Sequence, residues 1–282
     1  MPSPVLRFAP SPNGYLHLGH AFSVLFTDFW AKRLGGGTLL RLEDTDPTRC
    51  KPEFAEAIIE DLHWLGLSWP EPVRVQSTRF AAYAAEADRL RDRGLLYPCI
   101  CSRTEVAEHA IGTDPDGAPI YGGTCLHRPP AAIEAFAAEG GEPVQYRLHS
   151  AEAIALTGPL SFSVAGPTPM DRPHIRYARP ELWGDFVVQR KGTPTSYHLS
   201  VVIDDADQAI THITRGRDME AATDIHVLLQ MLLGLPQPIY TFHKLILGED
   251  GKKLAKSKGS PTLRSLREAG WTVADVSAAV GF

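Results

Sequence analysis

The sequence predicts an α/β protein built on a doubly wound parallel sheet, with a second domain inserted between the two halves of that sheet. Short apolar runs alternate with helical patterns as far as Gly94. The stretch from Leu96 to about Arg179 is instead rich in Gly and Pro, and helical and strand patterns resume beyond it. With 282 residues, of which 44% are apolar, the chain is long enough to bury a sizeable core.

The chain begins with a strand, a turn and a helix. Val5 to Ala9 is a short, mostly apolar run that suits a buried strand, and the Pro and Gly residues between positions 10 and 14 predict a turn. A helix is expected to begin near His17 or Leu18. Its apolar residues recur at helical spacing: Ala21, Phe22, Leu25, Phe26, Phe29 and Trp30.

The other elements follow in order along the chain. The first half of the sheet continues with a strand at Thr38 to Leu42 and helices near Glu53 to Leu65 and Arg79 to Arg93. The second half is expected to contain a strand at Ser196 to Ile203, a helix at Ala221 to Leu233 and a last strand at Tyr240 to Leu247. These patterns divide the chain into four parts: 1–94 and 181–238 as halves of the sheet domain, 95–180 as the insertion, and 239–282 as a lysine-rich loop with C-terminal helices.

Two histidines, His17 and His20, lie three residues apart at the expected start of the first helix. Unpaired backbone N–H groups and the positive end of the helix dipole make such a terminus an anion site. Gly19, between them, leaves room for a flat base or a ribose. For an isolated pair of histidines, capping or surface roles would be the better interpretation, but the surrounding Pro and Gly pattern favours phosphate binding.

Three of the four cysteines suggest a metal site. Cys99, Cys101 and Cys125 offer three thiolates, whereas disulfides are uncommon in a reducing compartment. The fourth ligand of a tetrahedral zinc site is either Tyr121 or His127, and the chemistry of zinc alone favours histidine. The simpler alternative is a set of reduced cysteines packed in a hairpin.

Charge and hydropathy narrow the class of protein. No apolar run approaches the length of a membrane span, and the N-terminus lacks the features of a signal peptide, so a cytoplasmic protein is expected. The net charge of −5 is unusual for a protein that contacts nucleic acid. Local basic patches, such as the lysines between positions 252 and 258, are expected to supply those contacts.

These motifs resemble those of the class I aminoacyl-tRNA synthetases, and specifically the glutamyl branch. The segment from His17 to His20 is similar to the His-x-Gly-His signature of this class. Three further blocks of the branch match at residues 41–49, 61–67 and 215–218. Lys253 to Ser257 is similar to the Lys-Met-Ser-Lys-Ser loop, although Leu254 and Ala255 depart from it; this departure bears more on loop dynamics than on nucleotide binding.

The resemblance implies a Rossmann-like catalytic domain that activates glutamate with ATP and Mg²⁺. His17, His20, Lys253 and Lys256 are then expected to bind ATP, with His17, His20 and Lys256 acting in catalysis. Arginine forks pair well with carboxylates, and an anion is needed for the α-ammonium group. The residues expected to hold glutamate are Arg7, Ala9, Ser11, Glu43, Tyr197 and Arg215.

The metal site and the acceptor follow from a narrower resemblance, to shortened paralogs of the glutamyl branch. These have Cys-x-Cys followed by Tyr-x-x-x-Cys, which implies that Cys99, Cys101, Tyr121 and Cys125 bind one structural Zn²⁺. Full-length enzymes can have Cys-x-His instead, which Cys125 and His127 also fit. The paralogs lack an anticodon-binding domain and attach glutamate to the queuosine base of tRNA(Asp), so ATP, L-glutamate and this tRNA are the expected partners of a monomeric enzyme.

Three other interpretations remain open from the sequence. One is a minimal glutamyl-tRNA synthetase that charges the 3′ end of tRNA, and another is a small-molecule adenylyltransferase. A third is a synthetase-derived binding protein without catalysis, although such proteins usually lose the histidines or the second lysine that are present here as His17, His20 and Lys256.

Overall fold

The computed structural model of the chain describes residues 3–140, 143–247 and 261–282. One sheet contains β1 (Val5–Phe8), β2 (Gly37–Leu42) and β3 (Arg74–Val75), all parallel. A second contains β6 (Ser161–Val164), β7 (His174–Tyr177), β9 (His212–Gly216) and β10 (Ile239–His243) in the order β7-β6-β10-β9. Strands β6, β10 and β9 are parallel, whereas β7 forms an antiparallel hairpin with β6.

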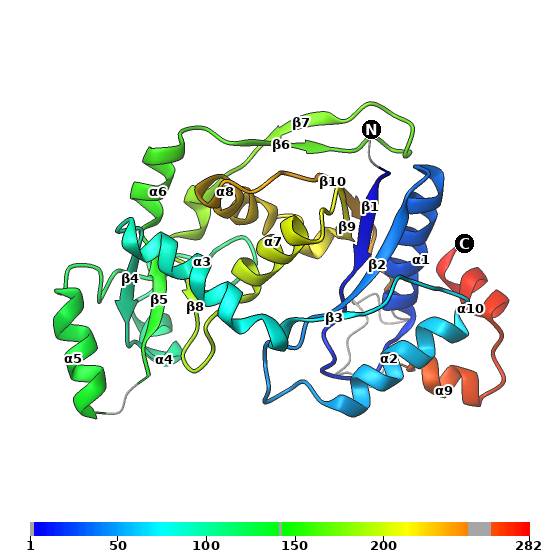
Figure 1. Ribbon diagram of the computed structural model, residues 1–282, viewed down its shortest axis with the longest axis horizontal. Helices are drawn as coiled ribbons and strands as arrows, with labels where there is room; N and C mark the ends of the chain where they lie inside the picture. Colours follow the sequence, from blue (N-terminus) through cyan, green and yellow to red (C-terminus); the bar gives the residue numbers. More distant parts are fainter. Residues whose placement is uncertain (1–2, 141–142, 248–260) are drawn as a thin grey trace.

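The two sheets meet where β1 lies beside the start of β9 (Figure 1). The Thr211 backbone N–H donates to the Val5 carbonyl at 2.9 Å, and the Val5 N–H donates to Thr211 Oγ1 at 2.9 Å. The strand order across this junction is β3-β2-β1-β9-β10, so the chain winds outward in both directions from β1 and β9. The carboxyl ends of these two strands form the switch point where α/β proteins place their ligands. The predicted α/β fold with a parallel sheet is confirmed.

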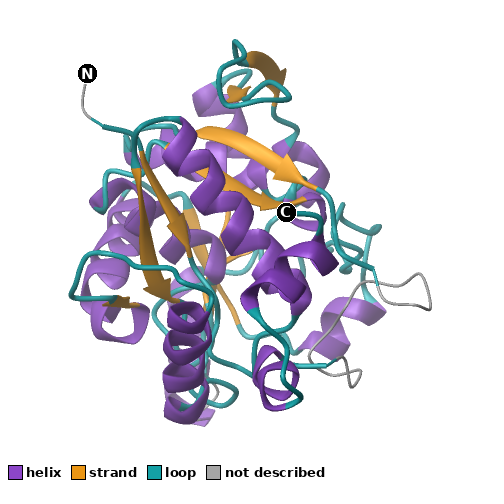
Figure 2. Ribbon diagram, turned by 90° about the vertical axis from the view of Figure 1, so that its right-hand side faces the viewer, coloured by secondary structure: helices purple, strands orange, loops and turns teal. Residues whose placement is uncertain are grey.

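Helices cover both faces of this sheet, as Figure 2 shows from the side of α1. Side chains alternate along β1, so Leu6 packs against Trp30 of α1 (Leu18–Arg33), whereas Arg7 faces the other way and meets Asp205 of α7 (Tyr197–Asp207). The remaining helices of the sheet domain are α2 (Pro52–Trp64), α3 (Phe80–Asp92), α8 (Thr223–Leu233), α9 (Leu263–Glu268) and α10 (Val273–Val280), with 3₁₀ turns at Gln76–Arg79, Pro180–Trp183 and Arg217–Met219. The predicted helices at the positions of α1, α2, α3 and α8 are confirmed.

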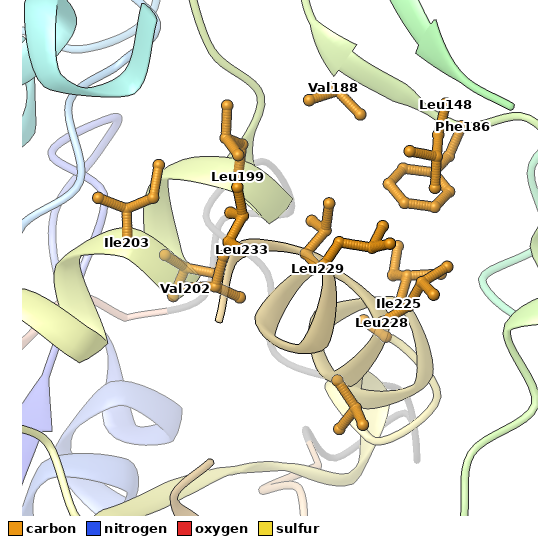
Figure 3. Packing of buried hydrophobic residues seen from close by; sticks show 14 of the residues in the cluster. Leu148, Phe186, Val188, Leu199, Val202, Ile203, Ile225, Leu228, Leu229 and Leu233 are labelled. Atoms are coloured by element: carbon orange, nitrogen blue, oxygen red, sulfur yellow. The ribbon is translucent and has the colours of Figure 1, made fainter. Parts of the chain in front are cut away.

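One predicted strand is wrong: Ser196 to Ile203 begins helix α7. Ser196 is the N-cap, and its side chain accepts a hydrogen bond from the Leu199 N–H. The helix is buried on nearly all sides, with Leu199, Val202 and Ile203 packed near Leu229 and Leu233 of α8 (Figure 3). Because every residue from Leu199 to Asp205 is buried, the apolar run with its β-branched Val201, Val202 and Ile203 imitates a buried strand. The predicted last strand is also shorter, because β10 ends at His243.

The inserted region is built around an antiparallel sheet of β4 (Leu96–Cys99), β5 (Gln145–Leu148) and β8 (Val187–Gln189). Helices α4 (Arg103–Glu108), α5 (Pro130–Gly140) and α6 (Ser150–Thr157) surround it, at the opposite end of the molecule from α10 (Figure 1). The β6–β7 hairpin lies within the predicted insertion in sequence, but it pairs with β10 of the main sheet. The division of the chain at residues 95–180 stays a prediction. No helix among the described residues has the length and apolar character to cross a membrane.

Candidate active site

A cavity of about 790 Å³ opens at the carboxyl ends of β1 and β9. It brings together the residues predicted to bind ATP and glutamate that the structure describes: Arg7, Ala9, Ser11, His17, His20, Glu43, Tyr197 and Arg215. The remaining two predictions, Lys253 and Lys256, lie outside the described residues. The side chains therefore converge from strand ends, a connecting turn and the first turns of two helices.

The two histidines cap helix α1 through their rings. His17 is the N-cap, and its Nδ1 accepts from the Gly19 N–H at 3.1 Å, while His20 Nδ1 accepts from the His17 N–H at 3.2 Å. Because both Nδ1 atoms accept, a neutral ring carries its proton on Nε2, which makes Nε2 a donor. A Cβ at Gly19 would lie 3.0 Å from His17 Cε1, so glycine leaves room for the capping ring. Capping and phosphate binding are thus compatible roles.

A buried network of charges lies under one side of the cavity. Asp205 accepts from Arg7 Nε at 3.0 Å and pairs with Arg41 Nη1 at 2.9 Å, and Arg41 Nη2 pairs with Glu43 at 3.1 Å. Burial alone would lower the pKa of Arg41, but the carboxylates of Asp205 and Glu43 raise it. Burial alone would raise the pKa of Asp205, yet Arg7 and Arg41 hold it below its ordinary value. Arg41 and Asp205 are therefore ionised and paired with each other.

Glu43 differs from Asp205 in its electrostatic balance. Burial raises its pKa, and the nearby charges of Arg41 and Arg7 oppose that shift without cancelling it. A further positive charge beside Glu43 would favour its ionised form. Its carboxylate thus lies where an ammonium group would be stabilised.

Arg215 has a different environment from the other buried arginines. It is 7% exposed, and no carboxylate among the described residues pairs with it. Its Nη1 lies 3.1 Å from Nδ1 of His226, while its buried Nη2 has no hydrogen-bond partner in the described part of the chain. Burial raises the pKa of Tyr197, which lies near enough to Arg215 and Glu43 to be affected by both charges. Arg215 thus presents an uncompensated positive charge at the cavity wall.

Several functional residues were missed from the sequence. Asp205 lies just beyond the predicted strand Ser196 to Ile203, and the wrong assignment of α7 hid its contact with Arg7. His226 gave no local signal, because its contact with Arg215 spans a strand and a helix. Three polar residues of the cavity wall lie near the carboxyl ends of β9 and β10: Thr214, His243 and Lys244. Their position at the ends of strands is the signal that would have found them.

The three predicted cysteine ligands lie together in the inserted region. The Sγ atoms of Cys99, Cys101 and Cys125 are buried and all within 4.8 Å of one another. The Tyr121 hydroxyl lies 3.6 Å from Cys99 Sγ and 3.6 Å from Cys101 Sγ. His127 is exposed, and it is not part of the group. The arrangement therefore places Tyr121, and not His127, beside the thiols.

The spacing of these sulfurs suits a tetrahedral ion. Cys101 Sγ and Cys125 Sγ are 3.6 Å apart. Two thiolates on one Zn²⁺, at about 2.3 Å each, would be separated by about 3.8 Å. Arg147 donates to Cys99 Sγ at 3.3 Å, and although burial alone would raise the pKa of this thiol, Arg147 lowers it to about 7. The residues present fit a structural zinc ion.

Known proteins resemble this chain in both sequence and structure. The catalytic domain of class I tRNA synthetases for glutamate and glutamine matches residues 5–273. A glutamyl-Q tRNA(Asp) synthetase of Rhodobacter capsulatus is 42% identical over 98% of this chain and 99% of its own length. A glutamate–tRNA ligase of Aquifex aeolicus is 37% identical over 94% of this chain. The chain spans only 54% of that ligase.

A solved structure agrees with this relationship. The crystal structure of a glutamate tRNA ligase from Elizabethkingia meningosepticum, in complex with its amino acid, superposes with a TM-score of 0.70 at 25% identity. The match covers 96% of this chain and 54% of that ligase. The fold of the whole described chain is therefore shared with the catalytic part of a longer enzyme.

Proposed function

The chain belongs to the class I tRNA synthetase family for glutamate and glutamine and is an ATP-dependent ligase, and from this we propose that it activates L-glutamate and transfers it to the queuosine base of tRNA(Asp). The observation that carries the choice of glutamate is Arg215, a buried guanidinium at the cavity wall that has no carboxylate partner among the described residues. A dicarboxylic amino acid supplies that partner.

The cavity offers a counter-charge for each charged group of glutamate. Arg215 pairs with one carboxylate through its unpartnered Nη2. Arg7 meets the other, because its Nη atoms make only long contacts, at 3.4 Å to the Thr214 carbonyl and 3.5 Å to Asp205. Glu43 takes the α-ammonium group, which stabilises its ionised form. The remaining proposed contacts come from Ala9, Ser11 and Tyr197.

ATP binds at the start of helix α1. The Nε2–H groups of His17 and His20 donate to its phosphates, assisted by the positive end of the helix dipole. Lys253 and Lys256 neutralise the charge that grows on the departing pyrophosphate. Mg²⁺ accompanies ATP in this proposal, and its charge adds to theirs.

Two transfers complete the proposed reaction. A glutamate carboxylate oxygen forms a bond to the α-phosphorus of ATP while the bond to pyrophosphate breaks, and this gives glutamyl-adenylate. A hydroxyl of the queuosine cyclopentenediol then bonds to the activated carbonyl carbon, and AMP leaves as the hydroxyl proton is lost. The protein contributes position and charge in both transfers.

Two findings support queuosine as the acceptor. The glutamyl-Q tRNA(Asp) synthetase of Rhodobacter capsulatus matches this chain along almost the whole length of both proteins. The glutamate–tRNA ligase of Aquifex aeolicus has nearly half of its length outside the match. The match is therefore to the whole of the former protein but to only part of the latter.

We further propose that Cys99, Cys101, Cys125 and Tyr121 hold one structural Zn²⁺. The clustered thiols and the adjacent hydroxyl support this assignment. When bound, the ion crosslinks β4 to the loop that contains Tyr121 and Cys125. It takes no part in the transfer of glutamate.

Amino-acid-dependent exchange of pyrophosphate into ATP tests the first half of the proposal. The purified protein is expected to catalyse exchange with glutamate, and Arg215→Ala and Glu43→Ala are each expected to lower kcat/KM by about 100-fold or more. Arg179→Ala, at an exposed arginine, is the matched control and should change nothing. Full exchange activity in Arg215→Ala and Glu43→Ala would refute the assigned glutamate site.

The position of the attached glutamate tests the second half. tRNA(Asp) that carries queuosine but has lost its terminal adenosine should accept glutamate as well as the intact tRNA does. A minimal glutamyl-tRNA synthetase would label only the intact 3′ end. Loss of labelling on the trimmed tRNA would therefore support that alternative instead.

A further inference from the structure

The buried arginines of the cavity are held in two different ways. Arg7 and Arg41 contact Asp205 at 3.0 Å and 2.9 Å, so protein carboxylates compensate their charges. Arg215 is equally buried, but among the described residues its polar side-chain contact is His226, and its guanidinium lies 5.2 Å from the ring centroid of Tyr240. A buried arginine is usually paired with a carboxylate, because an isolated charge is costly to desolvate. The exception needs a physical explanation.

The hydrogen bonds around His226 fix its tautomer. A guanidinium only donates, so His226 Nδ1 must accept from Arg215 Nη1, at 3.1 Å. The proton of the neutral ring is then on Nε2, which lies 3.1 Å from Nδ1 of His198. His226 lies on α8 and His198 on α7, so the pair bridges the two helices behind Arg215.

The surroundings keep both rings neutral. Burial and then the charge of Arg215 hold the pKa of His226 well below its ordinary value. Burial and Arg215 also lower the pKa of His198 to about 4. The aromatic ring of Trp183 lies 6.2 Å and that of Phe186 lies 6.1 Å from the ring of His198, which leaves this side of the pair apolar. At neutral pH neither histidine alters the charge of Arg215.

We propose that His226, supported by His198, is a positioning residue that orients Arg215 without neutralising it and thereby sets the preference for glutamate over glutamine. This inference rests on the proposed glutamate site. A carboxylate in place of His226 would orient Arg215 equally well, but it would also supply the negative charge that the substrate must bring. With the charge uncompensated, a substrate carboxylate gains more than a neutral amide of the same shape.

The test exchanges the charge and keeps the contact. His226→Asp places a carboxylate near Arg215, whereas His226→Asn offers a neutral oxygen acceptor, and both are assayed by pyrophosphate exchange with glutamate and with glutamine. The ratio of kcat/KM for glutamate over glutamine should fall by about tenfold or more in His226→Asp. It should stay within about threefold in His226→Asn. An unchanged ratio in His226→Asp, or equal losses in both variants, would overturn the inference.

A second measurement does not depend on whether these variants fold. Nitrogen NMR of the histidine-labelled wild-type protein at neutral pH should show His226 as a neutral ring protonated at Nε2. A doubly protonated ring would contradict the inference. If the wild-type protein shows no exchange with glutamate, the proposed function fails; if it does, and only the ratio in His226→Asp is unchanged, the role of His226 alone fails.

Discussion

The active-site cavity and the cysteine cluster are both buried polar sites, but they are assembled differently. In the cavity, Arg7 and Asp205 are separated by 198 positions and are brought together only by the complete sheet domain. In the cluster, Cys101 and Cys125 are 24 positions apart within one inserted region. The first site depends on the global fold and the second on a local one.

The two sites also differ in how their charge is compensated. Under the cavity, Arg7 and Arg41 pair with Asp205, and Arg41 also pairs with Glu43, so side chains of the protein already compensate much of this charge. In the cluster, Arg147 donates to Cys99 and lowers the pKa of that thiol to about 7, whereas burial raises the pKa of Cys101 to about 11. On the proposed assignments, the cavity takes a ligand for function, whereas the cluster takes a metal for structure.

Removal of one cysteine ligand should abolish metal binding. Cys101→Ser is expected to lose more than about 5 kcal/mol of zinc-binding free energy, because a tetrahedral site with two thiolates is far weaker. Metal analysis of the purified protein should find about one zinc in the wild type and almost none in this variant. Cys50→Ser, at a cysteine outside the cluster, should retain its zinc. Wild-type protein without zinc would refute the site.

Removal of Asp205 should destabilise the sheet domain. Asp205→Ala leaves Arg7 without its partner and Arg41 with a weakened one, at a cost of about 3–5 kcal/mol in the free energy of unfolding. Asp207→Ala is the matched control, because Asp207 is 44% exposed and its ion pairs should contribute less than about 1 kcal/mol. Denaturant unfolding measures both. Equal effects would show that the buried network is not the stabilising feature.

Asp61 is a buried carboxylate that has neither a close arginine partner, as Asp205 has, nor a proposed metal ion, as the cysteines have. Both of its oxygens lack a hydrogen-bond partner among the described residues, and Arg267 Nη2 is 3.9 Å away. Burial raises the pKa of Asp61 to about 6, above the ordinary value of 3.8, so its ionisation disfavours the folded state.

The raised pKa of Asp61 sets the sign of the pH dependence of the unfolding free energy. The unfolding free energy should fall as pH rises from about 4 through 6, by up to about 3 kcal/mol. Asp61→Asn should remove this component and be the more stable protein at pH 7. Unfolding of both proteins across this pH range is the measurement. Parallel curves for the two proteins would contradict the role of Asp61.

The smallest effect concerns the fourth zinc ligand. Tyr121→Phe removes the hydroxyl beside Cys99 and Cys101 and should weaken zinc binding by about tenfold, or about 1.4 kcal/mol. His127→Ala should leave the affinity unchanged, because the residue is exposed. Competition with a chromogenic chelator measures both. The reverse result would assign His127 as the ligand.

The sequence was informative where neighbouring residues determine the structure. The period of α1 and the two histidines at its start are local features, and both lie where they were expected. Helix α7 was misassigned because its run of buried, β-branched residues Val201, Val202 and Ile203 is equally typical of a buried strand. The choice between Tyr121 and His127 depended on burial, which spacing alone does not determine.

Contacts between distant segments were out of reach of sequence patterns. The ion pair of Arg7 with Asp205 and the contact of Arg215 with His226 join different strands and helices. The family resemblance indicated Arg7 and Arg215, which line the cavity. It did not indicate the residues that hold them.

Transfer of radiolabelled glutamate to tRNA tests the central claim most directly. The purified protein, with ATP and Mg²⁺, is given tRNA from cells that make queuosine and tRNA from cells that do not. Label on the queuosine-containing tRNA alone is the predicted result. Equal labelling of both tRNAs would contradict the claim and identify the chain as an enzyme that charges the 3′ end.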